Sequence, residues 1–149
     1  MGMATALTAA ALAVASGAMA DSYEPNDSRA SAKRVKLGGS YSSAISTGND
    51  VDLYLLRARA GTRVRVGLSK APGIGEESDG DVVGIELRQG RRLIASELVA
   101  SDVPFNYGHT IRGNRKKKKR APRFWIRIID GCAPPCGPMS YSLTIGRAG

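Results

Sequence analysis

The stretch that decides the fold runs from Gly48 to Leu68 and reads GNDVDLYLLRARAGTRVRVGL. Its first half, Val51 to Ala58, is apolar at most positions and lacks Pro and Gly, which predicts a strand covered on both faces. Ala60-Gly61 marks a tight turn, because Gly accepts backbone angles that other residues resist. From Thr62 to Leu68 apolar and polar residues alternate, as in a half-buried antiparallel strand. The stretch therefore predicts a hairpin.

The rest of the chain repeats this kind of pattern. Further strands are expected at Ser40–Ser46, Val82–Arg88, Arg91–Ser96, Arg123–Asp130 and Met139–Ile145. Ala30–Leu37 fits either a helical turn or a short edge strand, and Glu97–Thr110 fits no single assignment because Pro104 disfavours a central strand. No segment beyond the first twenty residues shows a helical period over ten residues. Seven or eight short strands between Gly and Pro turns predict an all-β sandwich.

The first twenty residues differ in composition from the remainder. They are almost wholly small and apolar, and Asp21 begins a polar sequence. Ala18-Met19-Ala20 fits the small-x-small pattern of signal-peptide cleavage, although the usual basic start is missing and the true N-terminus can lie upstream. The alternative is a membrane anchor, for which the Ala-rich run is marginal. We expect a signal peptide at 1–20 and one exported domain at 21–149.

The two cysteines, Cys132 and Cys136, lie in the short sequence GCAPPCG. In an exported protein such a pair is expected to form a disulfide. The closed loop is small, so the chain-entropy model assigns the bond a stabilisation on the order of 2–3 kcal/mol. A zinc site needs about four ligands, and the sequence offers no second cysteine pair and no histidine nearby.

The formal charge of +9 is concentrated in one segment. Arg112–Arg123 holds eight basic residues and no acid, and the rest of the chain is nearly neutral. Consecutive cations repel one another, so the segment is either a solvated connection between strands or a contact for a polyanion such as a cell-wall polymer, an acidic polysaccharide, lipid headgroups or DNA. A proteolytic processing site is a further alternative. The residues predicted for polyanion contact are Arg115, Lys116, Lys117, Lys118, Lys119 and Arg120.

Catalytic signatures are missing. His109 is the single histidine, and the chain has no Gly-x-Ser-x-Gly elbow, no His-Glu-x-x-His motif and no phosphate-binding glycine loop. A serine triad would need His109 to meet both a serine and an acid. We expect a surface or turn histidine and a protein that is not an enzyme.

Oxygen-bearing side chains form two clusters some twenty residues apart. Calcium takes six to eight oxygens from carboxylates, amides and carbonyls. If the clusters meet, their carboxylates repel one another unless a cation neutralises them. The alternative is that they are ordinary turn and cap residues. The predicted calcium ligands are Glu24, Asn26, Asp27, Asn49, Asp50 and Asp52; a weaker candidate is the acidic loop with Glu76, Glu77, Asp79 and Asp81.

Three features of the chain occur together in one known family. They are Tyr23–Ser28 (YEPNDS), Gly48–Tyr54 (GNDVDLY) and the C-terminal segments Phe124–Ile128 and Tyr141–Ile145. This combination resembles the bacterial pre-peptidase C-terminal domain, a module attached to secreted proteases and collagenases, and the resemblance covers residues 21–146. It implies a jelly-roll-like antiparallel sandwich without catalytic activity of its own.

In collagenase members this domain binds calcium between its opening segment and the Asp-bearing strand. Carried over to this chain, the resemblance implies the ligands Glu24, Asn26, Asp27, Asp50 and Asp52. Ser22 stands where those members can offer a further acid, for which Asp21 is the substitute. The expected function is an exported, non-catalytic module for binding or stabilisation. The alternative is an electrostatic adhesion protein that works through its basic loop.

Overall fold

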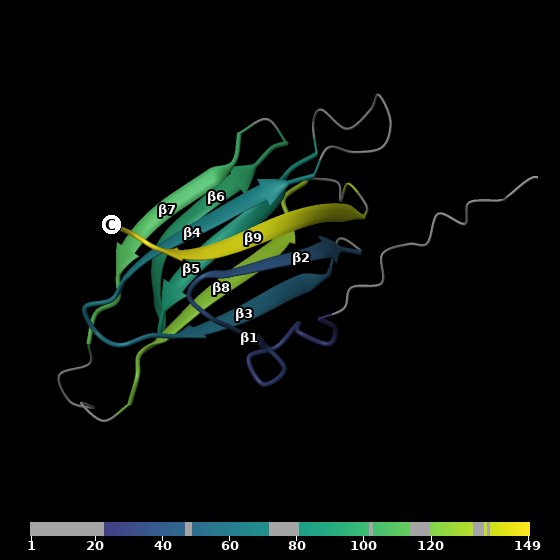
Figure 1. Ribbon diagram of the computed structural model, residues 1–149. Helices are drawn as coiled ribbons and strands as arrows, with labels where there is room; N and C mark the ends of the chain where they lie inside the picture. The colour runs from purple at the N-terminus through teal and green to yellow at the C-terminus, as the bar shows by residue number, and fades with distance from the viewer. Residues whose placement is uncertain are drawn as a thin grey trace, which may run out of the picture.

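The computed structural model describes residues 23–46, 49–71, 81–101, 103–113, 120–132, 136 and 138–149. These residues form nine strands in two sheets that pack face to face as a β-sandwich (Figure 1), which confirms the predicted fold class. The strands are β1 (Lys33–Val35), β2 (Gly39–Ile45), β3 (Val51–Arg57), β4 (Arg63–Lys70), β5 (Val83–Gln89), β6 (Arg92–Val99), β7 (Phe105–Thr110), β8 (Arg123–Asp130) and β9 (Met139–Arg147).

The five-stranded sheet has the order β1-β3-β8-β5-β6, and the four-stranded sheet has the order β2-β9-β4-β7. Every strand pair is antiparallel except that of β1 with β3. Between β1 and β3 the chain forms β2 in the other sheet. The chain reverses direction before β2 and again after it, so β1 and β3 run parallel. Ala30–Leu37, for which the sequence left a helical turn and an edge strand open, therefore contains the short edge strand β1.

The predicted hairpin in the stretch 48–68 is wrong. β3 pairs with β8 and β1, whereas β4 pairs with β9 and β7, so the chain crosses from one sheet to the other between Arg57 and Arg63. The turn itself is present, with Gly61 at a φ of 85°. Both strands send alternate apolar side chains into the same core, so their local pattern is that of a hairpin although they lie in different sheets. The expected strands Val82–Arg88 and Arg91–Ser96 correspond to β5 and β6, which pair with each other as a hairpin.

The core lies between the sheets, and alternate residues of β8 and β9 contribute to it. Phe124, Ile126 and Ile128 of β8 are fully buried, and they face β9 residues such as Leu143 across the interior. The outer face of β8 is covered as well, because the guanidinium of Arg29 lies over the Trp125 ring at 5.6 Å from its centroid. The described residues contain no helix with the length and hydropathy of a membrane span.

Candidate metal centre

Residues 23–32, here called the lead-in, dock on the sheet at the start of β3. The backbone N–H of Leu53 donates to the carbonyl of Asn26 at 3.1 Å, so the lead-in is hydrogen-bonded beside β3, which carries Asp52 and directly follows Asp50 (Figure 1). The two acidic clusters that are separate in sequence therefore meet at one end of the sandwich.

Three of the six predicted ligands come together there. Carboxylate oxygens of Glu24, Asp27 and Asp50 lie within 4.8 Å of one another, with Asp50 buried and the other two exposed. Two oxygens that bind one calcium ion at about 2.4 Å lie no more than about 4.8 Å apart, so this spacing fits a shared cation. Without a cation, three carboxylates at such a spacing repel one another.

Hydrogen bonds from the backbone and a serine orient two of these carboxylates. Oδ2 of Asp50 accepts from the backbone N–H of Ser46 at 2.6 Å and from the Ser46 hydroxyl at 2.8 Å. Oε2 of Glu24 accepts from the backbone N–H of Asn26 at 3.2 Å. These bonds fix the carboxylate positions, which reduces the ordering cost of binding an ion.

Asn26 is fully buried, although it sits between the exposed Glu24 and Asp27. Neither Nδ2 nor Oδ1 of its side chain has a hydrogen-bond partner among the described residues. A buried amide without partners costs free energy, about 1–3 kcal/mol by mutational measures. An amide oxygen is also a normal calcium ligand, so a cation at this end would supply the missing partner.

Asp52 and Asn49 lie differently from the cluster. Asp52 is fully buried and faces the sandwich interior, where its Oδ2 accepts a hydrogen bond from the Tyr141 hydroxyl. The hydroxyls of Tyr141 and Tyr54 are 2.6 Å apart, so the three side chains form a buried polar chain. Burial, and then the neighbouring Tyr54 and Asp52, raises the pKa of Tyr141. Asn49 is exposed and directly precedes Asp50.

Sequence reasoning missed Ser46 and the polar role of Tyr141. A serine four residues before an aspartate is a local signal for side-chain hydrogen bonding and could have identified Ser46. Tyr141 lies in the expected strand Met139–Ile145, but its partner Asp52 on another strand could not be read from the local pattern.

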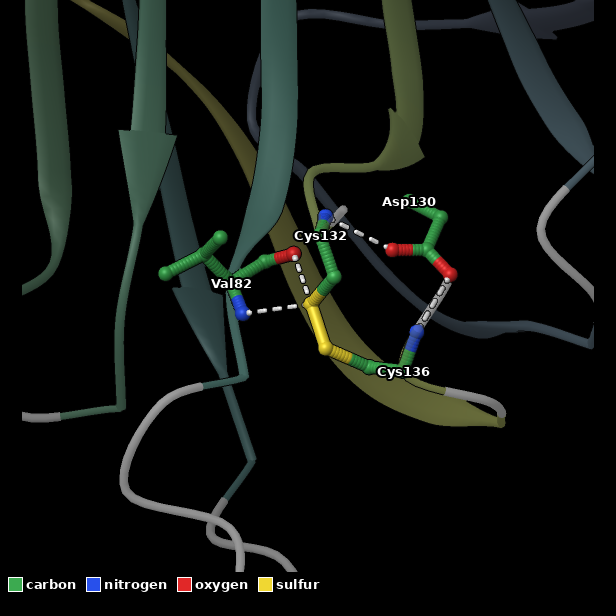
Figure 2. The surroundings of a disulfide bond; sticks show 4 residues. All are labelled: Val82, Asp130, Cys132 and Cys136. Atoms are coloured by element: carbon green, nitrogen blue, oxygen red, sulfur yellow. Dashed lines mark hydrogen bonds between the residues drawn. A yellow bond between two sulfur atoms is a disulfide. The ribbon is translucent and has the colours of Figure 1, made fainter. Parts of the chain in front are cut away.

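The predicted disulfide between Cys132 and Cys136 is present, with a Cα–Cα distance of 5.6 Å (Figure 2). The two oxygens of Asp130 accept from the backbone N–H groups of Cys132 at 2.8 Å and Cys136 at 3.1 Å. The N–H of Val82 donates to Cys132 Sγ at 3.4 Å, which ties the loop to the start of β5. Asp81 lies close to both sulfurs, but bonded sulfurs are not thiolate ligands, so the loop is structural.

Several predicted features lie outside the described residues. They are Arg115, Lys116, Lys117, Lys118 and Lys119 of the predicted polyanion contact, Glu76, Glu77 and Asp79 of the acidic loop, and the predicted signal peptide at 1–20. Arg120 of the predicted polyanion contact is described and exposed.

His109 is half-buried, and its Nε2 lies 3.1 Å from Oε1 of Gln89. Its ring stacks on Phe124.

The fold is similar to solved structures of other proteins. The pre-peptidase C-terminal domain of collagenase from Bacillus anthracis matches with a TM-score of 0.52 and 13% identity over 76% of this chain and 93% of that chain. A periplasmic inhibitor of g-type lysozyme from Aeromonas hydrophila matches with a TM-score of 0.48 and 14% identity, over 76% and 95% of the two chains. A xylan-binding module matches with a TM-score of 0.33 and 11% identity, over 72% and 78%.

At these identities the first likeness shows a shared β-sandwich fold and nothing about activity. No protein-family model matches the sequence, and neither does any curated protein.

Proposed function

We propose that this protein is an exported, non-enzymatic β-sandwich module, related to the pre-peptidase C-terminal domain, in which calcium fastens the lead-in to the sandwich. The observation that carries the proposal is the meeting of Glu24, Asp27 and Asp50 within 4.8 Å. Glu24 and Asp27 come from the opening segment and Asp50 from the start of β3, and the resemblance implies all three as calcium ligands. The shared sandwich fold supports the relation to that domain.

The buried amide of Asn26 supports a cation as the missing component. Three carboxylates give the cluster a formal charge of −3, and Oδ1 of Asn26 has no partner among the described residues. Calcium prefers this combination of carboxylate and amide oxygens, and it neutralises most of the charge. In this arrangement the ion joins the opening segment to the start of β3, and the lead-in becomes part of the folded domain.

The surroundings of His109 and Cys132 support a non-enzymatic, extracytoplasmic module. His109 pairs with the neutral side chain of Gln89, and among the described residues it meets no acid that would orient a catalytic base. The disulfide favours an oxidising compartment, as does the apolar segment at 1–20.

The test is thermal unfolding of the purified protein in millimolar calcium, in magnesium and in chelator, with calorimetric titration of calcium. An ion present at about a hundredfold excess over its dissociation constant stabilises the folded state by about 2.7 kcal/mol. For a domain of this size that corresponds to a rise in Tm of roughly 8–14 °C. Magnesium should give a smaller rise, because it binds all-protein oxygen cages poorly.

The Asp50→Asn variant should lose most of the calcium-dependent rise. Glu97→Gln is the matched control, because it removes one negative charge from an exposed position on β6 and should keep the whole rise. Equal melting temperatures with calcium and with chelator would refute the proposal. An Asp50→Asn variant that keeps the full response would refute the assignment of the site.

A further inference from the structure

The two ends of the sandwich carry opposite charge. β3, β5, β7 and β9 finish at the same end of the molecule, at the left and lower left of Figure 1, where β4, β6 and β8 begin. The carboxylate cluster and Asp130 lie at the opposite end, at the start of β3 and the end of β8.

Arginines from four separate segments gather at the first end. Arg57 at the end of β3 stands directly opposite Arg123 at the start of β8 in the strand register. Arg91 and Arg92 lie at the turn between β5 and β6. Besides Arg63 and Arg147 at the ends of β4 and β9, six exposed arginines lie at this end, and these six are here called the arginine pole: Arg57, Arg59, Arg91, Arg92, Arg112 and Arg123.

Gln89 fixes the position of Arg112 within the pole. Its Oε1 accepts from the backbone N–H of Arg112 at 3.1 Å, and its Nε2 donates to the Arg112 carbonyl. The same Oε1 lies 3.1 Å from Nε2 of His109. Burial, and then the positive charges of Arg112 and Arg92, lowers the pKa of His109, as expected where both guanidinium groups are close.

Carboxylate side chains of the described residues do not neutralise the pole. Within the described part of the chain the ion pairs join Glu86 to Arg88 and to Arg127. Glu86 and Arg127 lie opposite each other at mid-strand, and Arg88 is the next-to-last residue of β5. Six like charges at one end oppose folding through mutual repulsion, and no described acid offsets it. Such a surface fits an external partner with many negative charges.

The density of positive charge selects the kind of partner. The strands β3, β8, β5 and β6 are neighbours, so the pole extends over three strand spacings, about 14 Å. Double-stranded DNA carries one charge per roughly 1.7 Å of its axis and therefore offers about eight phosphates over that length. A polysaccharide with one carboxylate per sugar carries its charges several times farther apart. The planar guanidinium group of arginine can also donate two parallel hydrogen bonds to two oxygens of one phosphate.

The pole lacks the parts that read bases. Phe124 is buried and His109 is half-buried, so the described residues present no aromatic platform for stacking at this end. No helix among them is available to enter the major groove.

We propose that the arginine pole binds the phosphate backbone of double-stranded DNA without base recognition. The inference goes beyond the proposed function and uses different residues at the other end of the sandwich.

The test is fluorescence anisotropy of the purified protein with two labelled 20-bp duplexes of unrelated sequence, at several salt concentrations. Six phosphate contacts give a slope of about −5 for log K against log salt, so affinity should fall about a thousandfold between 50 and 200 mM salt. Both duplexes should bind equally. A preference between the sequences above tenfold would refute binding without base recognition.

The decisive variant is Arg57→Ser/Arg123→Ser, which removes two neighbouring charges and should reduce the salt slope by about 2. Arg29→Ser/Arg127→Ser is the matched control. Arg127 lies four residues from Arg123 along β8, and Arg29 lies over the Trp125 ring on the outer face of the sheet, so the change in net charge is the same and the slope should stay near that of the wild type. Equal slopes for the two double variants would overturn the proposal.

A second pair of measurements separates the pole from the basic loop and from other polyanions. In a background with Lys116–Lys119 replaced by Ser, binding at 50 mM salt should persist and still depend on Arg57 and Arg123. Loss of all binding in this background would overturn the proposal. So would displacement of the duplex by polygalacturonate as effectively as by unlabelled DNA at equal charge concentration. The melting temperature of each variant, measured with calcium and with chelator, shows whether the variant is folded and whether it keeps the proposed calcium site, and this measurement does not depend on DNA binding.

Discussion

Replacing Tyr141 by Phe tests the buried polar chain that joins the two sheets. The Tyr141 hydroxyl lies on β9 and donates to Asp52 on β3, and it is 2.6 Å from the Tyr54 hydroxyl. All three side chains have at most 2% of their surface exposed. The substitution removes one oxygen and keeps the aromatic ring, so it changes the hydrogen bonds with little effect on packing.

The expected loss of stability follows from the bonds removed. A hydrogen bond to a charged group contributes about 1.5–3 kcal/mol, and a neutral one about 0.5–1.5 kcal/mol. Tyr141→Phe should therefore lower the free energy of unfolding by about 2–4 kcal/mol. At roughly 3–5 °C per kcal/mol for a domain of this size, Tm should fall by roughly 6–20 °C.

The assay is denaturant unfolding in chelator, with Tyr107→Phe as the control. Tyr107 is half-buried and stacks on Phe105, and its hydroxyl makes no hydrogen bond with the described residues. The control should cost less than about 0.5 kcal/mol. Equal losses for Tyr141→Phe and Tyr107→Phe would refute the reasoning. The calcium-dependent rise in Tm should survive in Tyr141→Phe, because Asp52 lies outside the three-carboxylate cluster.

The same hydroxyl predicts a pH dependence. The pKa of Tyr141 is raised in the folded state, so above the ordinary value of about 10 the unfolded chain loses this proton and the folded chain keeps it. The contribution of Tyr141 to stability is complete below about pH 10 and declines above it, by about 1.4 kcal/mol per pH unit. Unfolding of the wild type between pH 9 and 11 should show this slope in excess of Tyr141→Phe; parallel pH profiles would contradict it.

Two further predictions concern the loop at 132–136 and the histidine. Cys132→Ser/Cys136→Ser should cost about 2 kcal/mol, because the closed loop spans only five positions; a loss above 5 kcal/mol in denaturant unfolding would show that the bond also holds β5 in place. The pKa of His109 is lowered in the folded state, so its contribution to stability is complete above about pH 6.5 and is lost as pH falls toward that lowered pKa. His109→Gln should flatten the stability profile between pH 7 and 5, and an unchanged profile would count against a lowered pKa.

Periodicity predicted the strands better than their partners. Arg123–Asp130 was expected as a strand, and β8 has those bounds, with Phe124, Ile126 and Ile128 on its buried face. The pairing of β3 with β4 failed, because alternation records which face is buried and carries no information on which sheet a strand joins. In a sandwich both sheets bury their inner faces in the same core, so neighbouring strands of different sheets look like a hairpin.

The candidate site was predictable to a similar degree. The sequence brought Glu24, Asp27 and Asp50 together as ligands of one type, and the structure places their oxygens within reach of one ion. It could not separate Asp50 from Asp52, which share one face of an extended chain. The difference depends on Tyr141, more than eighty residues later, whose hydroxyl lies over Asp52. Such a contact depends on sheet order, which local pattern does not determine.

The two proposed sites should act independently, because the length of β3 separates them. Seven residues of β3 span about 20 Å between Asp50 and Arg57, more than twice the screening length of about 8 Å at physiological salt. The charge of a bound calcium ion is therefore largely screened at the arginine pole. Any effect of calcium on DNA affinity would have to pass through the strands, and it would appear as the same factor in the effect of DNA on calcium affinity.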